Sequence, residues 1–232
     1  MKRILKATLP AVVIAAFLGI FSVNDAFGQD KLREILNRMD IHNKGMTTLR
    51  ARVTMVKTNA QLGGVADTTV GTALYAKGKG RNPLVRIDWE KPEESLAVRD
   101  GKYIMYRPRL GVAYVGSTDS AGRDTKSNSA LAFMSMSKAE LRANYEVALL
   151  SENATLSSGV QTWHLRLTPI KKTSYKLAEI WVDPNGMPHQ TKIIEQNDDT
   201  TTVLLTNLEK NVKLDGDAFE IKLAKGTKVQ KS

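Results

Sequence analysis

Residues 95–106 decide the fold; they read Ser95-Leu-Ala-Val-Arg-Asp100-Gly-Lys-Tyr-Ile-Met-Tyr106. Two short strand-like runs, 95–99 and 102–106, flank the dipeptide Asp100-Gly101. Asp-Gly between two such runs is a strong signal for a two-residue hairpin, because both residues tolerate the positive φ that this turn requires. The stretch therefore predicts two neighbouring antiparallel strands joined by a tight turn.

A period of two extends on both sides of this hairpin. Leu49, Ala51, Val53 and Met55 alternate with mostly polar residues, which predicts a strand with one apolar face. Further strands are predicted at 70–76, 84–89, 111–115, 145–150, 161–167, 175–182, 189–195 and 200–208. Turns recur roughly every 8–12 residues, a spacing typical of an antiparallel barrel. We expect a mainly β fold, an incomplete antiparallel β-barrel formed by a strongly curved sheet.

One helix is expected before the first strand. Leu32, Ile35, Leu36 and Met39 lie at positions i, i+3, i+4 and i+7, which is one apolar stripe of an amphipathic helix. Gly45 follows and can supply the left-handed turn that ends this segment.

A second helical region interrupts the strands in the middle of the chain. Residues 129–135, Ser-Ala-Leu-Ala-Phe-Met-Ser, follow the polar stretch 116–127 and have helical character. Ser137 and Glu140 then form a capping-box sequence that opens another short helix. Because so apolar a segment must cover something, we predict a movable lid whose Leu131, Phe133 and Met134 face an apolar cavity.

The first 28 residues have the features of a secretory signal peptide. Three basic residues precede the apolar run 11–21, and Ala26-Phe-Gly28 offers small residues at a cleavage site. The run is shorter than the ~20 apolar residues of a bilayer span, although an uncleaved anchor helix is the alternative. We expect cleavage near Gly28 and one exported domain over residues 29–232.

Composition narrows the class of protein further. The chain has no cysteine, so an exported domain must be held together by burial and strand pairing alone. The net charge is +10, but basic residues are interleaved with acidic ones along the strands. This favours a solvated basic surface, with attraction to an anionic membrane or an acidic partner as the alternative. No nucleic-acid partner is expected, and we expect a monomer.

Catalytic groups are hard to find. His42, His164 and His189 are far apart in the sequence and none has the spacing of a metal ligand. Ser135 and Lys138 match S-x-x-K, but the companion motifs S-D-N and K-T-G are absent. Adjacent carboxylates such as Glu93-Glu94 would point to opposite faces of a strand. We expect no enzyme activity, no catalytic residues, no cofactor and no metal.

Large apolar side chains recur on the predicted strand faces. We predict an apolar cavity under the lid, although each single residue is equally compatible with a solid core. The predicted lining is Val53, Met55, Ile87, Trp89, Met105 and Trp181.

Four stretches give the chain a resemblance to the LolA-like family of periplasmic lipoprotein carriers. The most specific of them is the hairpin, with its continuation to Pro108. Residues 49–55 resemble the family's first strand. Residues 71–92 resemble its next strand pair, which ends in a Trp and a nearby Pro. Residues 180–183, 202–207 and 219–221 fall in the order of its closing strands. The resemblance implies an incomplete barrel with a helical lid and no enzyme activity.

The same resemblance implies partners. Its members carry acylated lipoproteins from an inner-membrane ABC exporter to an outer-membrane receptor, so acylated lipoproteins or lipids are the expected cargo. An Arg of the family is thought to hold the lid shut, and Arg81 is the nearest candidate here. A lipid- or lipoprotein-sensing protein of the same fold and an exported hydrolase are the alternatives.

Overall fold

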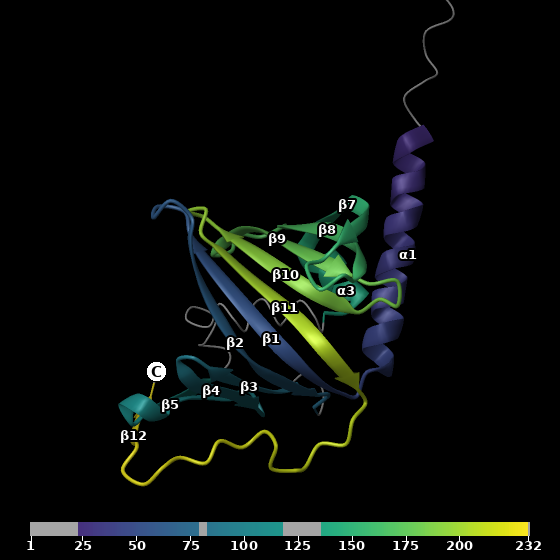
Figure 1. Cartoon of the computed structure of the whole chain (residues 1–232). Coiled ribbons are helices and arrows are strands. Elements are labelled where there is room, and N and C mark those ends of the chain that lie inside the picture. Colours follow the sequence, from purple (N-terminus) through teal and green to yellow (C-terminus); the bar gives the residue numbers. More distant parts are fainter. Residues whose placement is uncertain (1–22, 79–82, 118–135, 232) are drawn as a thin grey trace, which may run out of the picture.

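The computed structural model describes residues 23–78, 83–117 and 136–231. Within these ranges the chain forms one twelve-stranded sheet that curves strongly, with the two α-helices at one end (Figure 1). The strands are β1 Thr48–Asn59, β2 Val65–Ala76, β3 Leu84–Glu90, β4 Glu93–Arg99, β5 Lys102–Arg107, β6 Val112–Ser117, β7 Tyr145–Thr155, β8 Gln161–Pro169, β9 Tyr175–Val182, β10 Pro188–Glu195, β11 Thr200–Lys210 and β12 Lys228–Lys231. The helices are α1 Val23–Gly45, the 3-10 turn η1 Pro108–Leu110 and α3 Lys138–Asn144.

The order of the strands shows that the sheet does not close on itself. It runs β12-β6-β5-β4-β3-β2-β1-β11-β10-β9-β8-β7, so two antiparallel meanders meet where β1 pairs with β11. The two outer strands, β12 and β7, do not pair with each other, so the sheet stays open. The prediction of an incomplete antiparallel barrel is therefore confirmed: the sheet curves strongly but does not close.

The hairpin predicted from the sequence is present. Arg99 and Lys102 are opposite each other, which leaves Asp100 and Gly101 as the two turn residues. Their φ angles are 50° and 73°, as a type I′ turn requires at both positions.

Helix α1 covers one end of the concave face, where it lies beside the β9–β10 turn (Figure 1). The predicted stripe is buried: Ile35 and Leu36 are fully covered. The guanidinium of Arg38 donates to the carbonyl of Pro184 at 2.7 Å. A Cβ on Gly186 would overlap the Arg38 carbonyl, so glycine allows the turn to touch the helix. The helix ends at Gly45, which belongs to its last turn and does not have positive φ.

Helix α3 begins with the predicted capping box. The Ser137 hydroxyl accepts from the Glu140 backbone N–H, and the Glu140 carboxylate accepts from the Ser137 N–H. Lys138 joins this helix to α1 by donating to the side-chain oxygen of Asn37 at 2.6 Å. Met136, just before the helix, packs against the core of the concave face.

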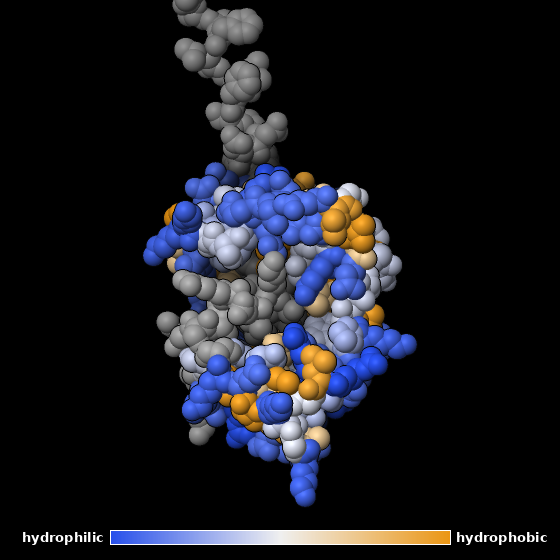
Figure 2. Space-filling model, turned by 90° about the vertical axis from the view of Figure 1, so that its left-hand side faces the viewer, coloured by the Kyte–Doolittle hydropathy of each residue, from blue (hydrophilic) through white to orange (hydrophobic). Residues whose placement is uncertain are grey.

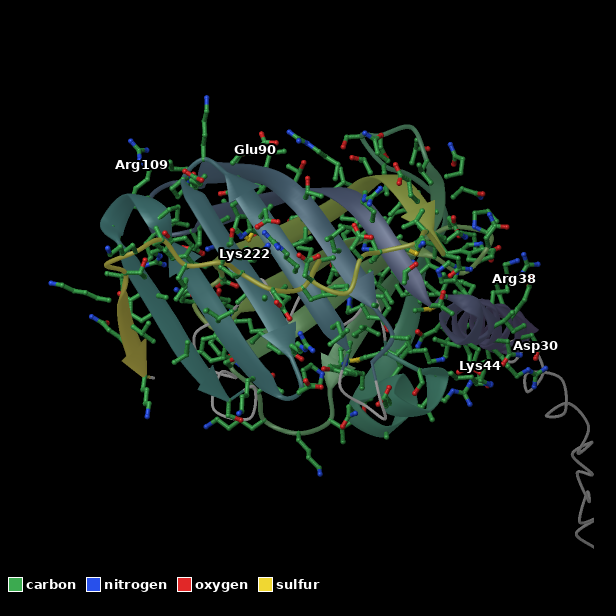
Figure 3. The ribbon with its side chains drawn as sticks, turned by 90° about the horizontal axis from the view of Figure 1, so that it is seen from below. Asp30, Arg38, Lys44, Glu90, Arg109 and Lys222 are labelled. Atoms are coloured by element: carbon green, nitrogen blue, oxygen red, sulfur yellow. The ribbon has the colours of Figure 1, made fainter. Side chains whose placement is uncertain are left out.

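The residues between β11 and β12 cross the outer face of the sheet (Figure 3). Arg86 donates to the carbonyl oxygens of Ala218 and Glu220, and Phe219 is 6% exposed. The predicted strand at 219–221 is therefore wrong: these backbone groups are held by an arginine side chain and not by a neighbouring strand. Strand β12, which the sequence analysis missed, then pairs in parallel with β6.

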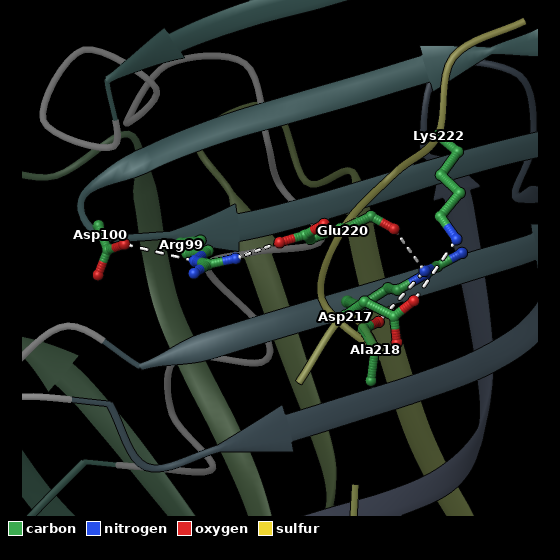
Figure 4. A network of polar contacts seen from close by, with 7 residues as sticks. Arg99, Asp100, Asp217, Ala218, Glu220 and Lys222 are labelled. Atoms are coloured by element: carbon green, nitrogen blue, oxygen red, sulfur yellow. Dashed lines mark hydrogen bonds and ion pairs between the residues drawn. The ribbon is translucent and has the colours of Figure 1, made fainter. Parts of the chain in front are cut away.

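Polar contacts hold this crossing segment in place (Figure 4). Arg99 bridges Glu220 at 2.7 Å and Asp100 at 3.4 Å, while Lys222 lies 3.5 Å from Asp217. The polar pocket between segment and sheet, about 350 Å³, also has Tyr106 in its lining. The crossing segment thus covers part of the outer face of β3 to β6.

Candidate functional site

The concave face is lined by side chains that stand opposite one another on successive strands. On β1 to β6, residues in register form the row Ala51, Ala73, Ile87, Leu96, Met105 and Tyr114. A second row crosses β2, β1 and then β11 to β7 as Thr69, Met55, Val203, Thr191, Ile180, Leu165 and Leu149. The strand alternation read from the sequence therefore produces one continuous, largely apolar surface.

The exposed surface has a different character. In the side view of Figure 2, hydrophobic residues form separate small patches among hydrophilic ones. Large apolar side chains that are exposed are scattered over different elements, for example Ile41 on α1, Leu62 in the β1–β2 turn and Leu110 on η1. Most of the buried apolar side chains among the described residues belong instead to one core cluster, which includes the concave face.

Five of the six predicted cavity residues come together on this face. Val53 and Ile87 are fully buried, Met55 and Trp89 are 5% and 6% exposed, and Met105 packs against them half-buried. They lie on β1, β3 and β5, and the five share one face because of the register.

Trp181 does not join them, which corrects the sequence prediction. It alternates along β9 with Ile180 and Val182, both fully buried, so its side chain points to the convex face. There it stacks on His164 with ring centroids 4.1 Å apart and an interplanar angle of 11°. The error is one of parity: a shift of one residue moves a side chain to the other face.

His164 is part of this convex surface. Its Nε2 lies 3.3 Å from a carboxylate oxygen of Glu179. Burial lowers the pKa of His164 more than the Glu179 carboxylate raises it, so the stacked imidazole is neutral near neutral pH.

The predicted lid residues Leu131, Phe133 and Met134 and the predicted latch Arg81 lie outside the described residues. Their roles remain predictions.

Two polar features of the concave face were not foreseen. The hydroxyl of Thr191 is fully buried in the second row and has no hydrogen-bond partner among the described residues. Next to Trp89, Glu94 accepts a hydrogen bond from Nε of Arg107 at 2.5 Å. In the sequence Glu94 is one of two adjacent carboxylates expected to point to opposite faces of a strand. Its cross-strand arginine becomes visible only with the register of β4 and β5.

A buried polar cluster also joins α1 to the sheet. Asp183 lies 3.1 Å from Nε2 of His189 and accepts backbone N–H bonds from Asn185 and Met187. Burial would raise the pKa of Asp183, but these hydrogen bonds hold it below its usual value. His42, on the last turn of α1, is in the field of both Asp183 and His189, and burial lowers its pKa.

Across the described ranges, no group of histidine and carboxylate side chains is arranged to hold a metal ion. In the same residues, no helix is long and apolar enough to cross a membrane.

Comparisons with known proteins agree with this geometry. Residues 47–222 match the family model of the outer membrane lipoprotein carrier protein LolA. No curated protein matches the sequence.

Solved structures share the fold at low sequence identity. An uncharacterized conserved protein from Thermus thermophilus is 12% identical with a TM-score of 0.55, over 87% of this chain and 99% of that one. MucB, a protein also known from a Pseudomonas aeruginosa complex, is 13% identical with a TM-score of 0.52, over 86% of this chain and 64% of MucB. Since the family model covers most of the chain, the protein belongs to the LolA family of outer membrane lipoprotein carrier proteins.

Proposed function

We propose that the protein is a non-enzymatic periplasmic carrier that shields the acyl chains of lipoproteins or lipids and transfers them toward the outer membrane. The observation that carries this proposal is the continuous apolar surface on the concave face of an open sheet. Family membership over residues 47–222 supports the same function.

Energetics favour a reversible carrier over a permanent store. Burying an acyl chain contributes ~0.8 kcal/mol per CH₂ group. Complete burial of two or three long chains would then exceed the practical limit of about −20 kcal/mol for non-covalent binding. A carrier must therefore leave its cargo partly exposed, or spend part of this free energy on opening, and an open sheet suits such release.

The route of the cargo follows from the same proposal. The signal peptide directs export and is cleaved near Gly28, which leaves residues 29–232 in the periplasm. An inner-membrane ABC exporter delivers the acylated protein, and an outer-membrane receptor accepts it.

Two measurements test the proposal. The protein is purified from the periplasm of its own host, and bound molecules are identified by mass spectrometry; acylated lipoproteins or lipids are expected. Purified, loaded protein is then mixed with outer-membrane vesicles, and the transferred cargo is counted. Cargo that binds and is never transferred would point to a sensor, and a preparation free of acylated molecules would contradict the proposal.

A further inference from the structure

A charged pair occupies the end of the apolar surface beside Trp89. Glu94 stands directly opposite Trp89 in the β3–β4 pair, so it faces the concave side. Its carboxylate accepts from Nε of Arg107, and the side chains are 20% and 41% exposed. Ser95, the next residue along β4, belongs instead to the lining of the outer pocket.

The guanidinium of Arg107 is hydrogen-bonded through Nε, and its other N–H groups are not used by the described residues. A guanidinium carries five N–H donors, of which Arg107 gives only the one on Nε to a partner among the described residues. Its planar group lies 5.7 Å from the ring centre of Tyr114, a residue that stands opposite Met105 on this face. The donors on Nη1 and Nη2 therefore remain available in a fixed orientation next to the apolar surface.

The chemistry of the pair selects its ligand. Arg107 stays positively charged, because the hydrogen bond to Glu94 raises the pKa of its guanidinium above the usual value. The negative charge of Glu94 makes the net charge of the pair zero. A second carboxylate at this place would face the negative charge of Glu94. A neutral carbonyl oxygen can accept the free N–H groups without that repulsion.

We propose that Arg107 binds the ester or amide carbonyl oxygens of an acylated ligand on the concave face, and that Glu94 disfavours free fatty-acid carboxylates. This inference rests on the proposed function and names the chemical class of its cargo: acyl chains joined through neutral linkages. The pair would thus keep free fatty acids from competing for the apolar surface.

The test compares two ligands that share one acyl chain. Dodecanoate and its glycerol monoester compete with a fluorescent apolar probe for the mature protein, at a pH where the acid is ionised. Wild type is expected to favour the monoester. Glu94→Gln removes the neutralising charge and should shift the affinity ratio toward dodecanoate by about tenfold, the size of losing one charge–charge repulsion near a protein surface.

Further variants separate recognition from folding. Arg107→Gln should weaken the monoester by about tenfold and leave the apolar probe bound, and Arg107→Lys should restore part of the loss. The control is Arg109→Gln, because Arg109 is exposed on η1, two residues further along the chain than Arg107. The affinity ratio of this variant should match that of wild type.

The outcomes distinguish the two proposals. An unchanged affinity ratio in Glu94→Gln, with the apolar probe still bound, would overturn the role of the pair and leave the carrier proposal intact. Failure of wild type to bind the probe at all would contradict the carrier proposal and this inference together.

Discussion

Gly71 stands directly opposite Trp89 in the β2–β3 pair, and a Cβ at position 71 would overlap the carbonyl oxygen of Asp88. The strands approach more closely here than any side chain allows, at the point where the concave face carries its large indole. The glycine therefore permits both the local curvature and the position of Trp89.

Gly71→Ala should destabilise the protein by about 1–3 kcal/mol, because the added methyl group meets backbone that has to move. Urea unfolding followed by circular dichroism measures this. Gly216→Ala is the matched control, since nothing lies within 4 Å of its added Cβ. Equal unfolding midpoints for the two variants would show that the close approach is not a constraint on the sheet.

Ligand binding should be visible in the fluorescence of one particular tryptophan. The chain has three tryptophans: Trp89 lies on the concave face, Trp163 lies on the same face but under Lys31 and Arg38 of α1, and Trp181 lies on the convex face. Adding an acyl glycerol should change the emission of wild type and of Trp181→Phe. The change should largely disappear in Trp89→Phe, and a signal that depends on Trp181 instead would place the ligand on the other face.

The Asp183 carboxylate should stabilise the fold in a pH-dependent way. Its pKa is lower in the folded protein than the usual 3.8, so its contribution is complete above that value and is lost as the pH falls through the folded pKa. Asp183→Asn should therefore cost about 1–3 kcal/mol at neutral pH, and the difference from wild type should shrink in acid.

Unfolding at a series of pH values measures that difference. Asp67→Asn is the control, because Asp67 is exposed and its substitution should have little effect at any pH. A stability difference between wild type and Asp183→Asn that is constant from neutral to strongly acidic pH would contradict the role given to the ionised carboxylate.

The main features of the fold can be predicted from local sequence patterns. Asp100-Gly101 specified its turn because positive φ is a local requirement, and Val53, Ile87 and Met105 reached one face because a strand alternates strictly. The prediction for Trp181 was wrong because both faces of its strand carry large apolar side chains. Alternation separates the two faces but does not say which of them is buried.

Other features depend on contacts between distant parts of the chain. The pairing of Arg107 with Glu94 required the register of two strands, and the crossing segment around Phe219 has no periodicity to reveal it. His42 lies in the electrostatic field of Asp183 although the two are far apart in the sequence, so no local motif predicts this proximity. The lid and the role of Arg81 stay predictions.

If acyl chains lie on the concave face, photocrosslinking in cells will capture them there. A photoreactive amino acid is placed at Met105 on the concave face and, as control, at Lys192, which is half-buried on the convex face of β10. After illumination, crosslinked species are analysed by mass spectrometry. Acylated lipoprotein or lipid should be attached at position 105 and not at position 192. Acyl chains captured at 192 and absent at 105 would contradict it.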